Sequence, residues 1–301
     1  MILQCAYGRG DKGISCLNIK ELQEMTESLG EGGEQDDGRR KKSTKEELYK
    51  KLLNHYGVKN DAELIKKYNS KSKKKIEVDE ILKPPTPGFY LSNTDIDMIF
   101  KQFANVHPEF MSYGGVPYDF WKKPEGSWKK NCDKIYGFDI LKFVGGNKRI
   151  WGMVCNTSPS SHSGSHWVCM FFEVKGNTAK LEYFDSIGTN ECRSMVNCNK
   201  DNVPTEIMKF IDIVKENCKK NGYKFKFTFN KTQHQRGNNE CGMYCIYYIL
   251  NRIKKVEYND VVDIPDEKMT YLRNVLFRSP HYCWECKKYK TSIVPLIKKW
   301  G

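Results

Sequence analysis

Four residues of the chain have the types and spacing that nucleophilic catalysis needs. His166 begins an apolar stretch, Asp185 ends the next one 19 residues later, and Gln235 and Cys241 stand six residues apart before a third. A thiolate is a strong nucleophile, an imidazole can take up and return its proton, and a carboxylate can orient the imidazole. Together the four residues predict covalent catalysis by a cysteine.

A predicted β-hairpin brings the histidine and the aspartate together. Residues 167–174 and 179–185 have the composition of strands, and Gly176-Asn177 between them is a pair typical of tight turns. In such a hairpin the end of the second strand lies beside the start of the first, so we expect Asp185 near His166. Taken alone, each residue also has a structural interpretation, as a strand-start histidine and a turn-capping aspartate.

The cysteine stands where a polar loop meets a predicted helix over 241–251. The first N–H groups of a helix lack partners, and the positive end of its dipole favours a thiolate. We expect Cys241 to face solvent at this helix start, and Cys245, one turn later, to be a buried hydrophobic residue. Gln235 can donate its amide N–H to a developing oxyanion, together with the backbone N–H of Cys241.

Three segments carry a family resemblance: GSHW at 164–167, YFDSIG at 183–188 and QRGNNECG at 235–242. They resemble the Ulp1/adenain-like cysteine proteases. Longer segments, YLSNTDIDMIF at 90–100, GMVCNTSPSSHSGSHWVCMFFEV at 152–174 and KLEYFDSIG at 180–188, most resemble the African swine fever virus-type polyprotein-processing proteases of large DNA viruses. The resemblance extends over about 89–278. It implies protein substrates cleaved after Gly-Gly, a helical arm ahead of a protease core, and a reaction without a cofactor.

The resemblance also implies a role for each residue. Cys241 would be the nucleophile, His166 the general base and then acid, Asp185 the orienting group and Gln235 a donor in the oxyanion hole. Trp167 would form the wall of a narrow channel that admits Gly-Gly and excludes side chains. In the viral enzymes the third member of the triad is an asparagine, whereas Asp185 is the commoner acid of the wider family.

The order of elements predicts an α+β fold, with a mixed β-sheet flanked by helices in a core over 89–301 and a helical arm over 1–88. Residues 1–42 should be poorly ordered, because Leu29 to Arg40 contains four glycines and many charges. Residues 43–69 predict two helices whose apolar residues would pack on the core.

Charge and cysteine content suggest partners and compartment. The net charge is +13, and 15 Lys and Arg against 7 Asp and Glu lie between Arg39 and Lys83. This arm is either a solvated helical surface or a contact for nucleic acid or an acidic scaffold.

No apolar run is long enough to cross a membrane, and the N-terminus lacks the features of a signal peptide. The irregular spacing of the 12 cysteines favours free thiols in a reducing compartment.

Two weaker signals concern metal binding and self-processing. His281, Cys283 and Cys286 include a C-x-x-C pair, but a zinc site needs four ligands, so we expect no metal. Gly32-Gly33 lies in polar sequence where the enzyme could cleave its own chain. Gly114-Gly115 and Gly145-Gly146 are interpreted as turn or linker residues.

The sequence thus predicts a viral endopeptidase that processes structural polyproteins during virion maturation and acts in the virion and the host cytoplasm. A cellular SUMO or ubiquitin-like-modifier protease would use the same four residues and is the main alternative. An acetyltransferase with this triad and a catalytically inactive binding module are two further alternatives.

Overall fold

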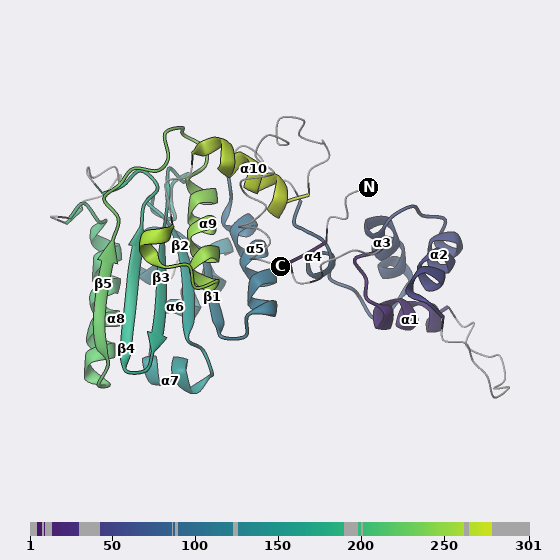
Figure 1. Cartoon of the computed structure of the whole chain (residues 1–301), viewed down its shortest axis with the longest axis horizontal. Coiled ribbons are helices and arrows are strands. Elements are labelled where there is room, and N and C mark those ends of the chain that lie inside the picture. Colours follow the sequence, from purple (N-terminus) through teal and green to yellow (C-terminus); the bar gives the residue numbers. More distant parts are fainter. Residues whose placement is uncertain are drawn as a thin grey trace. The chain divides into compact units, whose positions relative to one another are not determined.

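The chain forms two compact units, residues 1–85 and 86–301, so the division falls close to the predicted boundary after residue 88. The computed structural model, drawn in Figure 1, describes a set of ranges that together contain all the predicted catalytic residues. These ranges are 5–7, 9, 14–29, 43–85, 87, 90–122, 126–189, 198–199, 201–261 and 265–278.

The first unit is helical. Its helices are α1 (Ile19–Glu27), α2 (Lys45–Tyr56), α3 (Asp61–Lys71) and the short α4 (Val78–Ile81). Capping boxes begin α1 and α2, because Asn18 and Thr44 accept hydrogen bonds from the third backbone N–H of each helix. The two helices predicted over 43–69 are confirmed, whereas the expectation of disorder over 1–42 is wrong for α1.

The apolar residues of this unit form a core of their own. Leu22 and Met25 of α1 pack with Leu52 of α2 and with Leu64 and Ile65 of α3, and all five are fully buried. The prediction that the arm helices bury their apolar face on the protease core is therefore wrong. The segment before residue 43, which the sequence suggested was disordered, supplies the complementary apolar surface.

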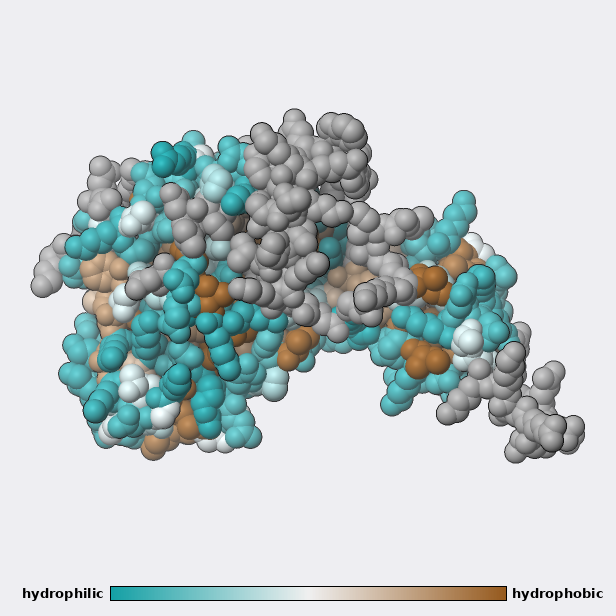
Figure 2. All heavy atoms as spheres, in the orientation of Figure 1, coloured by the Kyte–Doolittle hydropathy of each residue, from teal (hydrophilic) through white to brown (hydrophobic). Residues whose placement is uncertain are grey.

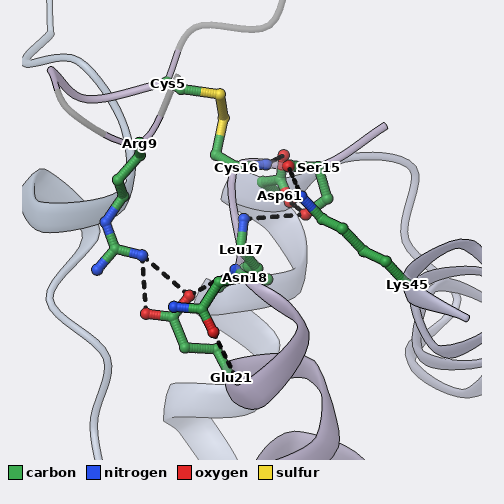
Figure 3. The surroundings of a disulfide bond; sticks show 9 residues. All are labelled: Cys5, Arg9, Ser15, Cys16, Leu17, Asn18, Glu21, Lys45 and Asp61. Atoms are coloured by element: carbon green, nitrogen blue, oxygen red, sulfur yellow. Dashed lines mark hydrogen bonds and ion pairs between the residues drawn. A yellow bond between two sulfur atoms is a disulfide. The ribbon is translucent and has the colours of Figure 1, made fainter. Parts of the chain in front are cut away.

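A disulfide between Cys5 and Cys16 closes the N-terminal segment of this unit (Figure 3). Next to it, the backbone N–H of Cys16 donates to Asp61 Oδ2 over 3.2 Å, and the Ser15 hydroxyl donates to the other oxygen of the same carboxylate. Cys198 is disulfide-bonded as well. The expectation of free thiols throughout is therefore wrong, since two sulfurs held next to each other by folding can form a bond whatever their spacing in the sequence.

The second unit is built on a mixed five-stranded sheet (Figure 1). The strands follow the order β1-β2-β3-β4-β5, and β1 pairs with β2 and β4 with β5 in parallel, while β2, β3 and β4 are antiparallel neighbours. Their bounds are β1 Phe110–Val116, β2 Ile150–Asn156, β3 Trp167–Lys175, β4 Thr178–Phe184 and β5 Lys224–Phe229.

Helices cover both faces of the sheet, so the unit has the predicted α+β architecture. On one face α9 packs against β2 and β3; on the other, side chains of α6, α7 and α8 share a core with the sheet. The helices are α5 Asn93–Val106, η1 Phe120–Lys122, η2 Gly126–Trp128, α6 Lys129–Ile135, α7 Ile140–Gly145, α8 Thr205–Lys220, α9 Cys241–Ile253, η3 Tyr258–Asp260 and α10 Asp266–Leu276.

Strand β1 was not predicted, because its two glycines suggested a turn. Gly114 lies inside the strand at a β-bulge, with a φ of +69°. A Cβ atom there would lie 2.0 Å from Asp97 Oδ1, so only glycine allows the carboxylate to approach and accept the N–H of Gly115 over 2.9 Å. The interpretation of Gly114-Gly115 as linker residues is wrong.

A buried ion pair fixes α9 on the sheet. Arg252 of α9 donates from Nε and Nη2 to the two carboxylate oxygens of Glu182 in β4, over 2.7 and 3.0 Å. The hydroxyl of Tyr248, one turn earlier, donates to the same carboxylate over 2.7 Å. Glu182 is fully buried, and a buried charge is tolerated only in such a paired geometry. These contacts set the position of the helix along the strands.

We predict that the Cys5–Cys16 disulfide holds the N-terminal segment against the end of α4. The backbone N–H of Ala6 donates to Ile81 O over 2.9 Å, a contact that depends on the closed segment. Loss of a native disulfide typically costs about 2–5 kcal/mol. Reduction, or the change Cys5→Ser, should therefore speed hydrogen exchange of the Ala6 amide, with amides of β3 as the internal control. Unchanged exchange at Ala6 would contradict the prediction.

Candidate active site

His166 lies directly before β3, at the start of the central strand of the sheet, and the loop that leads to it is held by hydrogen bonds. Asn156, the last residue of β2, accepts the N–H groups of Ser158 and Ser165 on Oδ1, over 2.9 and 3.3 Å. The backbone N–H of Thr157 donates to His166 O over 2.9 Å. These contacts join the two ends of the loop, which is rich in serine and glycine, and so fix the backbone of His166.

The imidazole of His166 lies between a carboxylate and a thiol. Its Nε2 atom is 2.8 Å from Asp185 Oδ1, which is the contact that the hairpin predicted. Its other hydrogen bond is with the side chain of Cys241, at the first position of α9. With Nε2 occupied by Asp185, Nδ1 is the nitrogen left for the thiol.

The two neighbours of the imidazole favour its charged form. Burial lowers the pKa of His166, but the hydrogen bonds and negative charges of Asp185 and Cys241 outweigh that effect and raise the pKa to about 10. At neutral pH the site therefore holds an imidazolium. Such a cation beside a cysteine stabilises the thiolate, which is the reactive form.

Cys241 is 5% exposed, so the expectation that it faces solvent is wrong. The start of α9 is covered by Leu91: a Cβ atom on Gly242 would lie 2.9 Å from Leu91 Cδ1. Cys245, one turn later, is fully buried as predicted, and its thiol donates to Trp167 O over 3.4 Å.

Asp185 is held by an asparagine that the sequence did not single out. The backbone N–H of Asp185 donates to Asn230 Oδ1 over 2.8 Å, and Asn230 Nδ2 donates back to Asp185 O over 2.7 Å. The carboxylate also caps a turn, because Oδ1 accepts the N–H of Ile187 over 3.0 Å. Asp185 thus has both the turn-capping and the histidine contacts. Asn230 directly follows β5, and nothing in the local sequence marks it.

Gln235 is 2% exposed, and both ends of its amide are engaged. Oε1 accepts the hydroxyl of Ser186 over 2.7 Å, and Nε2 donates to Gly237 O over 2.6 Å. Its backbone N–H donates to Ser186 O over 2.7 Å. Because an amide nitrogen has two N–H groups, one remains for a further acceptor. Ser186 therefore links the loop of Gln235 to the strand end that carries Asp185.

Trp167 is largely covered, with 6% of its surface exposed. Its indole N–H donates to Leu91 O over 3.0 Å, and the centre of its ring is 6.4 Å from that of Trp128. The tryptophan next to the histidine thus packs under the same Leu91 that covers the start of α9. Trp128 was not predicted as a neighbour of this site.

Four of the other free thiols of the described residues are less acidic than usual. Burial raises the pKa of Cys132 and Cys218 to about 12. It raises the pKa of Cys155 and Cys245 well above the ordinary value. These four thiols are therefore protonated and unreactive near neutral pH.

Two weaker predictions fall outside the described residues: the His281, Cys283 and Cys286 cluster and the Gly32-Gly33 pair. Within the described ranges, no group of three or more His, Cys, Asp and Glu side chains could hold a metal ion. The helices in the same ranges are all too short or too polar to span a bilayer.

Comparison with known proteins agrees with this geometry. Residues 156–281 match the C-terminal catalytic domain of the Ulp1 protease family. This range contains His166, Asp185, Gln235 and Cys241. This part of the chain is thus similar to a Ulp1-family catalytic domain, and the chain is a cysteine protease.

Viral proteins are among its relatives. The chain is 29% identical over 196 residues to the SUMO-1 cysteine protease of African swine fever virus, an alignment that covers 62% of this chain and 67% of that protein. It is 26% identical over 197 residues to a thiol protease of Acanthamoeba polyphaga mimivirus, covering 63% and 57%. The crystal structure of the African swine fever virus protease matches with a TM-score of 0.61 at 23% identity, over 91% of this chain and 95% of that one, and so has the same fold.

The geometry of His166 predicts how activity depends on pH. If His166 protonates the departing amine, as the sequence predicts, kcat/KM for peptide cleavage should fall as the pH rises through about 10. Asp185→Asn removes a negative charge that raises the pKa of His166, so this alkaline limb should move to lower pH. Asp212→Asn, at an exposed position of α8, is the matched control and should leave it in place. If activity falls at the same alkaline pH in the unchanged protein and in both variants, the role given to Asp185 in raising the pKa of His166 is wrong.

Proposed function

We propose that the chain is an endopeptidase of a large DNA virus that cleaves structural polyprotein precursors after Gly-Gly, in the virion and the host cytoplasm. The observation that carries the proposal is the hydrogen-bonded series Asp185, His166 and Cys241, with the cysteine at the N-terminus of a buried helix. The viral origin of the relatives supports the source and the substrate class.

In the proposed reaction, the Cys241 thiolate attacks the carbonyl carbon of the scissile bond, and the carbonyl electrons move to oxygen. The His166 imidazolium then donates its proton to the departing amine as the tetrahedral intermediate collapses to a thioester. The neutral imidazole next takes a proton from water, whose oxygen attacks the thioester carbonyl. The C–S bond then breaks, which releases the acid and restores the Cys241 thiolate beside the imidazolium. Asp185 keeps the ring in place through Nε2 in both halves of the reaction.

The oxyanion would be stabilised by N–H groups that are already oriented. The backbone N–H of Cys241, at the helix start, is one of the groups that a helix leaves without an internal partner. The second N–H of Gln235 Nε2 would be the other donor, since the first is held by Gly237 O. Donors fixed in advance cost no reorganisation when charge develops, and removal of one typically costs about 2.7–4 kcal/mol.

Specificity for Gly-Gly would follow from how closely the site is covered. Trp167 and the start of α9 both lie against Leu91, so little space remains beside the nucleophile. Residues without a Cβ atom can lie flat in such a space. The close approach of Leu91 to Gly242 supports a preference for glycine on the acyl side of the cleaved bond.

The main alternative is a cellular protease that removes SUMO or a related modifier. A viral relative bears the description SUMO-1 cysteine protease, and the same four residues would serve either reaction. The modifier and the viral polyprotein sites both end in Gly-Gly, so only the substrates themselves distinguish the two functions.

We also propose that the arm contacts nucleic acid. Exposed lysines follow one another along α3 and the segment after it, and Lys66, Lys67 and Lys73 form no ion pair with any described residue. Lys74, in the same segment, is paired with Glu24 of α1 and is left out of this set. Hydrophilic residues also lie on the face of the protease unit shown in Figure 2. A phosphate backbone would suit the lysine run best, since it offers regularly spaced anions.

The cleavage assay uses two substrates and the whole chain. We predict that the protein cleaves a peptide with a Gly-Gly-Xaa site and leaves a SUMO precursor intact, and that Cys241→Ala and His166→Ala abolish cleavage because each removes a reacting group. Cleavage of the SUMO precursor alone would overturn the viral endopeptidase in favour of the modifier protease. Cleavage by the Cys241→Ala variant would overturn the mechanism.

For the arm, we predict that changing Lys66, Lys67 and Lys73 together to Gln weakens binding to duplex DNA. The slope of log K against log salt should fall by about one for each phosphate that these lysines neutralise. A control with the same loss of charge changes Lys215, Lys219 and Lys220 of α8 to Gln. Binding that weakens equally in both variants, or in neither, would contradict the proposal. Binding to polyglutamate but not to DNA would indicate an acidic scaffold instead.

A further inference from the structure

The loop between Gln235 and Cys241 is attached to α10, a helix that lies later in the sequence. Asp266, the first residue of α10, accepts two backbone N–H groups of this loop on Oδ2. They are those of Arg236, over 3.0 Å, and of Gly237, over 2.6 Å. The first residues after Gln235 are thus held by a single carboxylate oxygen.

The same residue, Gly237, also holds the side-chain amide of Gln235. Gly237 O accepts Gln235 Nε2 over 2.6 Å, so Gly237 is bound to Asp266 through its N–H and to Gln235 through its carbonyl. The orientation of the Gln235 amide therefore depends on where Asp266 places Gly237. From the other side, the Ser186 hydroxyl fixes Gln235 Oε1.

A second contact from the same helix holds the other end of the loop. Arg273 Nη2 donates to Glu240 Oε2 over 2.9 Å, and Glu240 directly precedes Cys241. Asp266 and Arg273 are seven residues apart, which on a helix places them on one face. One face of α10 therefore contacts the loop at both of its ends.

We propose that Asp266 is a positioning residue of the oxyanion hole: it fixes the Gly237 peptide so that the second N–H of Gln235 Nε2 stays directed at the developing charge. This inference rests on the proposed role of Gln235. Hydrogen bonds to an ionised carboxylate are roughly twice as strong as neutral ones. The other oxygen of Asp266, Oδ1, is buried and has no partner among the described residues, so the two loop N–H groups are the main hydrogen-bond donors to this carboxylate.

The role is separable from activation of the nucleophile. The carboxylate of Asp266 binds the loop backbone, whereas the pKa of His166 is raised by Asp185 and Cys241. Loss of Asp266 should therefore reduce stabilisation of the transition state and leave the thiolate as reactive as before. Alkylation measures the second property and peptide turnover the first.

The experiment compares Asp266→Ala with Glu267→Ala, a neighbour on the same turn of α10, in the full chain. Asp266→Ala should lower kcat for a Gly-Gly peptide by about 10–100-fold with little change in KM, a part of the ~10²–10³-fold loss expected when an oxyanion donor is removed. The rate of Cys241 alkylation by iodoacetamide should stay the same. Asp266→Asn, which keeps an acceptor oxygen, should recover part of kcat, and Glu267→Ala should match the unchanged protein.

A double variant separates this inference from the function on which it rests. Adding Asp266→Ala to Gln235→Ala should cost little more than Gln235→Ala alone, because both changes remove the same donor. If Gln235→Ala lowers kcat while Asp266→Ala and Asp266→Asn do not, the positioning role is wrong and the oxyanion role stands. If Gln235→Ala leaves kcat unchanged, the oxyanion role itself is wrong. Additive losses, or a parallel loss of alkylation, would show a general structural role for Asp266 and overturn the inference.

Discussion

The site depends on holding a positive charge on a largely buried imidazole. Burial alone would strip the proton from His166, and only two anionic partners within hydrogen-bond distance reverse that effect. Each partner comes from a different element. Asp185 is positioned by the β3–β4 hairpin and Cys241 by α9. The fold must therefore hold the sheet and α9 at a relative position that keeps both hydrogen bonds to His166.

The buried ion pair between Glu182 and Arg252 holds α9 in this position. It joins β4, the strand that ends next to Asp185, to the last turn of α9, the helix that starts with Cys241. The two charges must keep their hydrogen-bonded geometry, because separating them would leave the buried carboxylate of Glu182 without a compensating positive charge. The pair lies away from the reacting atoms, yet it sets the register between the elements that carry two of them.

What the sequence predicts well here is local. The Gly176-Asn177 turn sets the register of β3 and β4, and this register alone places Asp185 beside His166. The boundary between a polar loop and an apolar run places Cys241 at the start of α9. Both inferences use neighbours in the chain, so they require no knowledge of packing.

What the sequence does not predict comes from distant parts of the chain. Gly114 suggested a turn, yet it lies in β1 because Asp97 of α5 needs the space that a side chain would fill. The exposure expected for Cys241 failed because Leu91, 150 residues earlier, covers the helix start. Asn230, which clamps the backbone of Asp185, follows a strand without any recognisable motif. In each case the deciding contact joins residues with no regular spacing between them.

The polar loop before α9 shows why such distant contacts are needed. A segment with glycine and asparagine and no regular secondary structure has many accessible conformations, yet the proposed mechanism needs it to present Gln235 and the N–H of Cys241 to the same oxygen atom. Its own sequence cannot select that conformation. The selection comes from outside the loop, from Ser186 at the end of β4 on one side and from α10 on the other. The proposed nucleophile and oxyanion donors therefore come together only once the sheet, α9 and α10 have packed. The geometry of the candidate site is thus a property of the complete protease unit and not of the motif that first indicates it.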